Sequence, residues 1–201
     1  DGKPFTYWDL ADDLLALLDH LGLDRAVLGG MSQGGFSALR AALRQPARVQ
    51  GLVLISTQAG VDSAEALAGY RTMLDMWSTM GAVDPLLETV CGLILGEKSL
   101  WEPWISRMRA LPKEGVREPG LCLFDRDDLT ARVAEITCPA IVFHGTADAS
   151  IPLERGEALA RALPGCANFV RIEGASHASN LSHPAQVNAP LQAFLRALAS
   201  R

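Results

Sequence analysis

The sequence predicts an α/β fold built on a mostly parallel sheet, in which strands and helices alternate along the chain. Four short apolar runs have the length and composition of buried strands: 26–30, 51–56, 140–144 and 168–172. Segments with apolar residues at helical spacing lie between these runs, as in parallel sheets with crossover helices. Between the second and third strands, residues 61–130 contain no strand pattern and predict helices alone.

The N-terminal part predicts a helix, a strand, a second helix and a second strand. The first helix, at 7–21, begins after Thr6, a suitable N-cap with Asp9 three residues later, and it stops at Gly22. The second helix, at 35–44, follows the first strand directly and has apolar residues on one face.

The middle of the chain has a different character from its two ends. Four helices are expected there, at about 63–80, 84–95, 99–110 and 116–124. Strand-helix alternation then returns and ends on an amphipathic helix. We therefore expect a core of residues 1–60 and 131–201 with a helical insertion at 61–130.

The pentapeptide Gly30-Met31-Ser32-Gln33-Gly34 lies at the turn from the first strand into the second helix. A serine between two glycines at such a turn is the nucleophile elbow pattern. The turn is sharp, so the residues two before and two after the serine nearly touch, and glycine adds no Cβ there. The serine is expected to be strained, with its hydroxyl exposed above the positive helix N-terminus. Ser32 is therefore the predicted nucleophile, and its strand-helix context excludes most chance matches to the pentapeptide.

Two further segments supply an acid and a base in the order Ser, Asp, His. Asp148 follows the strand at 140–144, and His177 lies in the loop after the strand at 168–172. All three residues come just past the carboxyl ends of predicted strands, where open parallel sheets bind their ligands. This chain order is one of those known for catalytic triads. The backbone N–H of Gln33 is expected to supply one oxyanion-hole donor.

Other titratable residues fit these roles less well. His183 opens the last helix before a proline, which favours a capping or packing role, and His144 lies on a strand, where a structural role is expected. The acidic cluster at 125–128 precedes a helix and is expected to be solvated or to cap it. Residues 56–58, after the second strand, offer no carboxylate. Asp148 is therefore the predicted acid.

The motifs GMSQGG, HGTADASIP and EGASHASNLSHP resemble the nucleophile, acid and base segments of the α/β-hydrolase fold family. The resemblance extends from about residue 6 onward, and it is to the type with a helical cap inserted after the sixth strand. It implies a three-layer α/β-hydrolase fold and catalysis by Ser32, His177 and Asp148, with no cofactor and no metal. It also implies that residues 61–130 form the cap.

In capped hydrolases the inserted segment roofs the active site, and its large side chains contact the apolar part of the substrate. Methionine and tryptophan are concentrated in this segment of the chain. As a group, Trp77, Trp101 and Trp104 are therefore the expected pocket residues, whereas any one of them taken singly is expected to pack the cap against the core.

The chain departs from the family pattern at its N-terminal end. The family's sheet has eight strands with the elbow after the fifth, whereas here Ser32 lies close to the N-terminus and only four strands are predicted. The first four strands are missing from the pattern, as is the loop that carries an HG-type motif and the second oxyanion donor. The chain begins at Asp1 without a methionine. We therefore expect a fragment of a longer protein, with impaired activity.

Composition excludes several classes of partner. The net charge of −5 and the lack of a basic run argue against nucleic acid and anionic membrane surfaces, and no apolar run is long enough to span a bilayer. The four scattered cysteines lack metal-ligand spacing and predict free thiols, which favours a cytoplasmic location: Cys91, Cys122, Cys138 and Cys166. The oligomeric state stays open.

The expected activity is that of a serine hydrolase acting on a small carboxylic ester, lactone or related acyl compound. Carboxylesterases, enol-lactonases, carbon–carbon bond hydrolases and cofactor-free perhydrolases share this triad, so the sequence does not separate them. Ser32 in place of an aspartate at the elbow argues against dehalogenase and epoxide-hydrolase chemistry. The alternative from another class is a non-enzymatic member of the fold that binds a small molecule.

Overall fold

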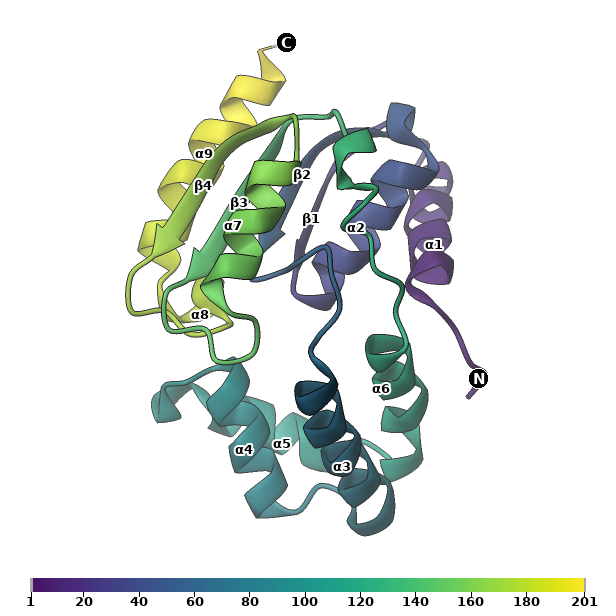
Figure 1. Ribbon diagram of the computed structural model, residues 1–201, viewed down its shortest axis with the longest axis vertical. Helices are drawn as coiled ribbons and strands as arrows, with labels where there is room; N and C mark the ends of the chain where they lie inside the picture. The colour runs from purple at the N-terminus through teal and green to yellow at the C-terminus, as the bar shows by residue number, and fades with distance from the viewer. Residues whose placement is uncertain (1, 201) are drawn as a thin grey trace.

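The computed structural model describes residues 2–200 and has three layers, with one parallel sheet between two layers of helices (Figure 1). The sheet has the order β1-β2-β3-β4, and every neighbouring pair is parallel. These strands are β1 (Ala26–Met31), β2 (Val49–Ile55), β3 (Ala140–Gly145) and β4 (Cys166–Ile172). They are the four that the sequence predicts, with small differences at their ends. The predicted α/β class with a parallel sheet is therefore confirmed.

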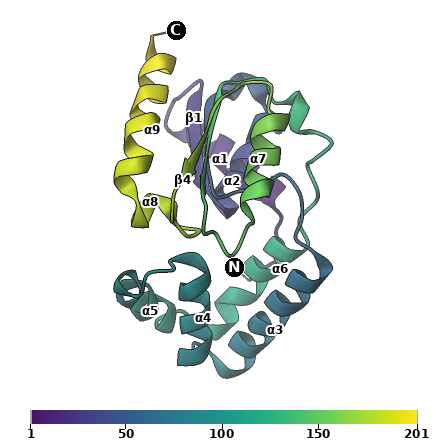
Figure 2. The same ribbon diagram turned by 60° about the vertical axis from the view of Figure 1, so that its left-hand side comes forward.

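Helices cover both faces of the sheet (Figure 2). One face carries α1 (Tyr7–His20), α2 (Gln33–Arg44) and α7 (Leu153–Ala162), and the opposite face carries α9 (Pro184–Ala199). Each face of the sheet has its own cluster of buried apolar side chains. Successive strand residues point to opposite faces, so Leu52 and Leu54 join one cluster while Val53 joins the other. Burial on both faces explains why the strands are continuous apolar runs rather than alternating ones.

The ends of the first helix follow the expected capping chemistry. Thr6 accepts a hydrogen bond from the Asp9 N–H, and the Asp9 carboxylate accepts one from the Thr6 N–H, which completes a capping box. Gly22 follows the helix with φ of 66°, in the left-handed region that favours glycine.

Between β2 and β3 the chain forms a helical insertion, which lies beyond the carboxyl ends of the strands (Figures 1 and 2). Its helices are α3 (Ala64–Met80), α4 (Asp84–Ile94), α5 (Glu102–Arg109) and α6 (Arg117–Phe124). They match the four predicted helices. The third begins later than expected because a 3₁₀ turn precedes it.

Short helical segments complete the chain: η1 (Pro46–Arg48), η2 (Lys98–Leu100), η3 (Lys113–Val116), η4 (Val133–Glu135) and α8 (Ser179–Ser182). Strand β1 pairs only with β2 in the described part of the chain, so its other side is a sheet edge. None of the helices within residues 2–200 has both the length and the hydropathy needed to cross a membrane.

Candidate active site

Ser32 lies at the turn between β1 and α2, in a strained backbone conformation with φ of 50° and ψ of −112°. Its N–H donates to the Ile55 carbonyl at 2.8 Å, and its carbonyl accepts from Thr57 Oγ1 at 2.9 Å. Both partners belong to β2 or to the loop after it. A non-glycine residue keeps such a conformation only when its surroundings impose it, and these bonds do so.

Two glycines allow the elbow to close. A Cβ on Gly30 would overlap the backbone of Gly34, and a Cβ on Gly35 would lie 2.6 Å from the Thr57 side chain. A Cβ on Gly34 would meet open space. The expected close approach of residues 30 and 34 is thus present, and it requires glycine at 30 but not at 34, while Gly35 is required by a separate contact with Thr57.

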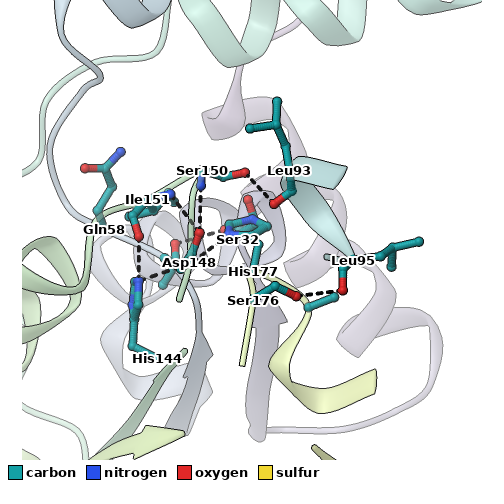
Figure 3. A network of polar contacts seen from close by, with 12 residues as sticks. Ser32, Gln58, Leu93, Leu95, His144, Asp148, Ser150, Ile151, Ser176 and His177 are labelled. Atoms are coloured by element: carbon teal, nitrogen blue, oxygen red, sulfur yellow. Dashed lines mark hydrogen bonds and ion pairs between the residues drawn. The ribbon is translucent and has the colours of Figure 1, made fainter. Parts of the chain in front are cut away.

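Asp148 and His177 come from the loops after β3 and β4, and their side chains are buried together (Figure 3). His177 Nδ1 lies 2.8 Å from Asp148 Oδ2, while Asp148 Oδ1 accepts the N–H groups of Ser150 and Ile151 at 2.9 Å each. Because Nδ1 faces a carboxylate it carries the proton, which leaves His177 Nε2 as a proton acceptor.

Asp148 stays ionised in this arrangement. Burial alone would raise the pKa of its carboxyl group, but hydrogen bonds from His144 and His177, the charge that His177 carries when it is protonated and the Ile151 N–H together hold that pKa well below its usual range. The carboxylate can therefore hold the His177 imidazole in one orientation and balance a positive charge on it.

His144 touches the same carboxylate from the end of β3. Its Nε2 lies 2.8 Å from the Ile151 carbonyl and 3.3 Å from Asp148 Oδ2 (Figure 3). Since both of these neighbours are acceptors, Nε2 must be the protonated nitrogen. Nδ1 is buried without a partner in the described chain and faces Gly156 of α7. The expected structural role thus includes a direct contact with Asp148, which the sequence does not predict.

The end of α4 contacts the loops that carry the acid and the base. The Leu93 carbonyl accepts from Ser150 Oγ at 3.1 Å, and the Leu95 carbonyl accepts from Ser176 Oγ at 2.7 Å (Figure 3). Ser150 is two residues after Asp148, and Ser176 directly precedes His177. The helical insertion is therefore hydrogen-bonded to the loop that carries Asp148 and to the loop that carries His177.

A cavity of about 310 Å³ separates the helical insertion from the carboxyl ends of the strands. Ser32, Gln33 and His177 line it together. Most of its wall is apolar and comes from the insertion, including Met73, Leu74, Trp77, Leu86, Val90 and Phe124. The three residues predicted from scattered motifs therefore lie at, or directly behind, one cavity.

Of the three tryptophans expected in the pocket, the structure brings one to the cavity. Trp77 of α3 lines it, whereas Trp101 packs beside Cys91 and Leu95, and Trp104 is 41% exposed. Trp101 and Trp104, which precede and begin α5, are not among the lining residues of this cavity, and α5 packs on α4.

The other candidates for the acid and the base, in the acidic cluster at 125–128 and at His183, do not line the cavity. Asp127 pairs with Arg40, Asp125 pairs with Arg71, and Asp128 accepts the Thr130 N–H. The His183 ring contacts Ser182 Oγ at the start of α9.

Among residues 2–200, no group of three or more histidine, cysteine or acidic side chains could hold a metal ion.

One cavity residue has no counterpart in the sequence interpretation. Asp62 lies on the cavity wall, four residues beyond the segment 56–58 in which no carboxylate was found. Its side chain pairs with Arg126, which is 64 residues further along the chain. No local pattern marks such a pair, so only an unusual acidic residue in the loop after the second strand could have drawn attention to it.

Comparison with known proteins identifies a family, and it also finds relatives named as esterases and a lactonase. The model of the alpha/beta hydrolase family matches residues 1–189. The pimeloyl-acyl-carrier protein methyl ester esterase of Chromobacterium violaceum is 32% identical over 201 residues, which span 95% of this chain and 74% of that protein. The structure of a thermophilic esterase from Thermogutta terrifontis has a TM-score of 0.84 and 32% identity, covering 98% of this chain and 74% of that one. The enol-lactonase from Burkholderia xenovorans has a TM-score of 0.81 and 27% identity, covering 96% and 74%.

Proposed function

Because the chain belongs to the alpha/beta hydrolase family, we propose that it is a serine hydrolase acting on a small carboxylic ester, lactone or related acyl compound. The family and the esterase and lactonase relatives confirm the predicted α/β-hydrolase-type enzyme. One observation carries the finer proposal: a strained elbow serine and the His177 of a buried Asp-His pair line the same cavity.

The proposed reaction has two halves. His177 Nε2 takes the proton of Ser32 as the serine Oγ attacks the acyl carbonyl carbon, and the imidazolium then gives this proton to the leaving alcohol oxygen. Water next attacks the acyl-enzyme with His177 again as base, which releases the acid and restores Ser32. Asp148 keeps the imidazole oriented and stabilises its cation in both halves.

The first turn of α2 supports charge stabilisation at the carbonyl oxygen. Gln33 is the first residue of this helix, so its N–H lacks an intrahelical partner and lies at the positive end of the helix dipole. We propose this N–H as one oxyanion donor. Loss of one such donor costs about 10²–10³ in turnover in a serine protease, so turnover here depends on this donor and on a second one.

We further propose that residues 61–130 act as a cap on a core formed by residues 1–60 and 131–201. The cavity wall formed by the helical insertion is apolar, which suits the hydrocarbon part of an acyl group. The catalytic groups lie outside this segment, so the cap would set selectivity and leave the chemistry to the core.

An ester or lactone is the preferred substrate class because the relatives of this chain include a methyl ester esterase and an enol-lactonase. A protein that only binds a small molecule has no need for an ionised Asp148 held against His177. The paired base therefore favours the enzyme over a non-enzymatic binding protein.

Substitution of the nucleophile tests the proposal. Ser32→Ala should abolish labelling by a fluorophosphonate probe and hydrolysis of p-nitrophenyl hexanoate, while circular dichroism stays unchanged. Asp148→Asn should lower kcat by about 10⁴, as the corresponding change does in the serine-protease template. Asp125→Asn is the matched control, because Asp125 is an exposed carboxylate paired with Arg71, and it should keep full activity. Labelling retained in Ser32→Ala would contradict the assignment.

A further inference from the structure

The cavity wall carries little charge, and the charge that it carries is negative. Among its described lining residues Asp62 is the one carboxylate, and no lysine or arginine lines it. The other ionisable lining groups are Tyr70 and the proposed base His177. A substrate that enters the cavity therefore meets apolar side chains and a carboxylate.

Asp62 is held in place on both of its oxygens. Oδ1 accepts from Gln58 Nε2 at 2.9 Å, and Oδ2 accepts from Arg126 Nη2 at 2.9 Å. The Asp62 side chain keeps 13% of its surface exposed, whereas that of Arg126 keeps only 1%. The carboxylate thus stands between the guanidinium and the cavity.

Both terminal nitrogens of the Arg126 guanidinium are hydrogen-bonded on its own side of the wall, while its buried Nε has no partner among the described residues. Besides Asp62, it donates to the carbonyls of Gly60 and Leu123. Its central carbon lies 4.5 Å from the centre of the Phe36 ring, and Phe36 lines the cavity. An anion in the cavity would therefore be separated from this cation by Phe36 and Asp62.

The charges of Asp62 and Asp148 also act on Tyr70, another residue of the cavity wall. Burial raises the pKa of the Tyr70 hydroxyl, and the charges of Asp62 and Asp148 raise it further, against a smaller opposite effect of Arg126. Tyr70 lines the cavity, so two carboxylates act on the same part of its surface.

We propose that this cavity selects esters whose acyl group is neutral and apolar, that it rejects acyl groups carrying a second carboxylate, and that Asp62 determines this selectivity. The inference rests on the proposed hydrolase function. A carboxylate drawn into the cavity would lose its water without gaining a cationic partner, and it would lie near Asp62 and Asp148. A methyl group at the same position would gain apolar contacts instead.

Two esters of equal chain length test the selection. We would measure kcat/KM at pH 7.5 for p-nitrophenyl hexanoate and for mono-p-nitrophenyl adipate, each corrected for its uncatalysed hydrolysis. Because the adipate carboxylate would be placed near a like charge without a cationic partner, the hexanoate should be preferred by at least about tenfold. A smaller preference would overturn the inference and leave the hydrolase function standing. Hydrolysis of neither ester would instead contradict the proposed function.

A variant of Asp62 tests the assignment to this residue. Asp62→Asn removes the charge at nearly constant shape, so the hexanoate preference should fall by about fivefold or more through faster adipate turnover. Asp125→Asn is the control and should leave the preference unchanged, since Asp125 pairs with Arg71 at the surface. An unchanged preference in a folded Asp62→Asn protein would refute the role of Asp62.

Asp62→Asn leaves the buried Arg126 without its ion-pair partner, and this variant could fail to fold for that reason. A second variant therefore tests the effect of charge in the cavity while the pair stays intact. Met73→Lys places a cation on the same cavity wall without disturbing that pair. It should raise adipate turnover relative to hexanoate turnover by about fivefold or more, because the added ammonium can pair with the substrate carboxylate. No relative gain would show that charge in the cavity does not control selection, and would overturn the inference.

Discussion

Substitution of Gly156 in α7 tests whether the contact of His144 with Asp148 holds the Asp148 carboxylate in place. A Cβ at this position would lie 2.8 Å from Cγ of His144 and still closer to Nδ1. The His144 ring is fully buried, and its Nε2 is bonded to Ile151 and close to Asp148. The ring therefore has no free space, and Gly156→Ala must displace either α7 or the ring.

The size of the effect follows from two opposing terms. Alanine is favoured over glycine inside a helix by about 0.5–1 kcal/mol. Overpacking of a filled core costs about 1–3 kcal/mol. The net expectation is a loss of stability of about 1 kcal/mol, within limits of about 0 and 2.5 kcal/mol, and a loss of about 1 kcal/mol lowers Tm by about 2–4 °C for a chain of this size. A displaced His144 would also move Asp148, so kcat should fall while KM changes little.

Gly69→Ala is the matched control. Gly69 lies in α3, is exposed, and a Cβ on it would meet nothing within 4 Å. This change should stabilise the protein by about 0.5–1 kcal/mol with unchanged kcat. Thermal unfolding followed by circular dichroism, together with p-nitrophenyl hexanoate kinetics, would decide between the two outcomes. A Gly156→Ala protein as stable and as active as Gly69→Ala would refute the reasoning.

Two further predictions concern the cavity and the sheet edge. Trp77→Ala should shift the preferred acyl length of p-nitrophenyl esters upwards, because Trp77 lines the cavity, while Trp104→Ala on the exposed side of α5 should not; equal profiles for both variants would show that Trp77 does not bound the pocket. The protein should associate in solution, because β1 pairs only with β2 among residues 2–200 and leaves an edge beside the apolar Val27 and Leu28. Size-exclusion chromatography with light scattering measures this association, and a monomer that stays stable on concentration would contradict the prediction.

Local patterns in the sequence were sufficient to predict the elements of this fold and the order of the proposed triad. The four strands are apolar runs because both faces of the sheet are covered, and the first helix begins where Thr6 and Asp9 can cap it. Ser32 could be predicted because a strand that turns directly into a helix needs small residues around its tip. Each of these signals depends on residues that are close together in the chain.

Tertiary structure alone decided which distant side chains meet. Helical spacing predicts an apolar face but not its partner, so Trp77 reached the cavity while Trp101 packed behind α4. The Asp62–Arg126 pair and the contact of His144 with Asp148 also follow from the way the segments pack. Such contacts depend on sheet register and on how the insertion folds back over the strands, which residue spacing along the chain does not encode.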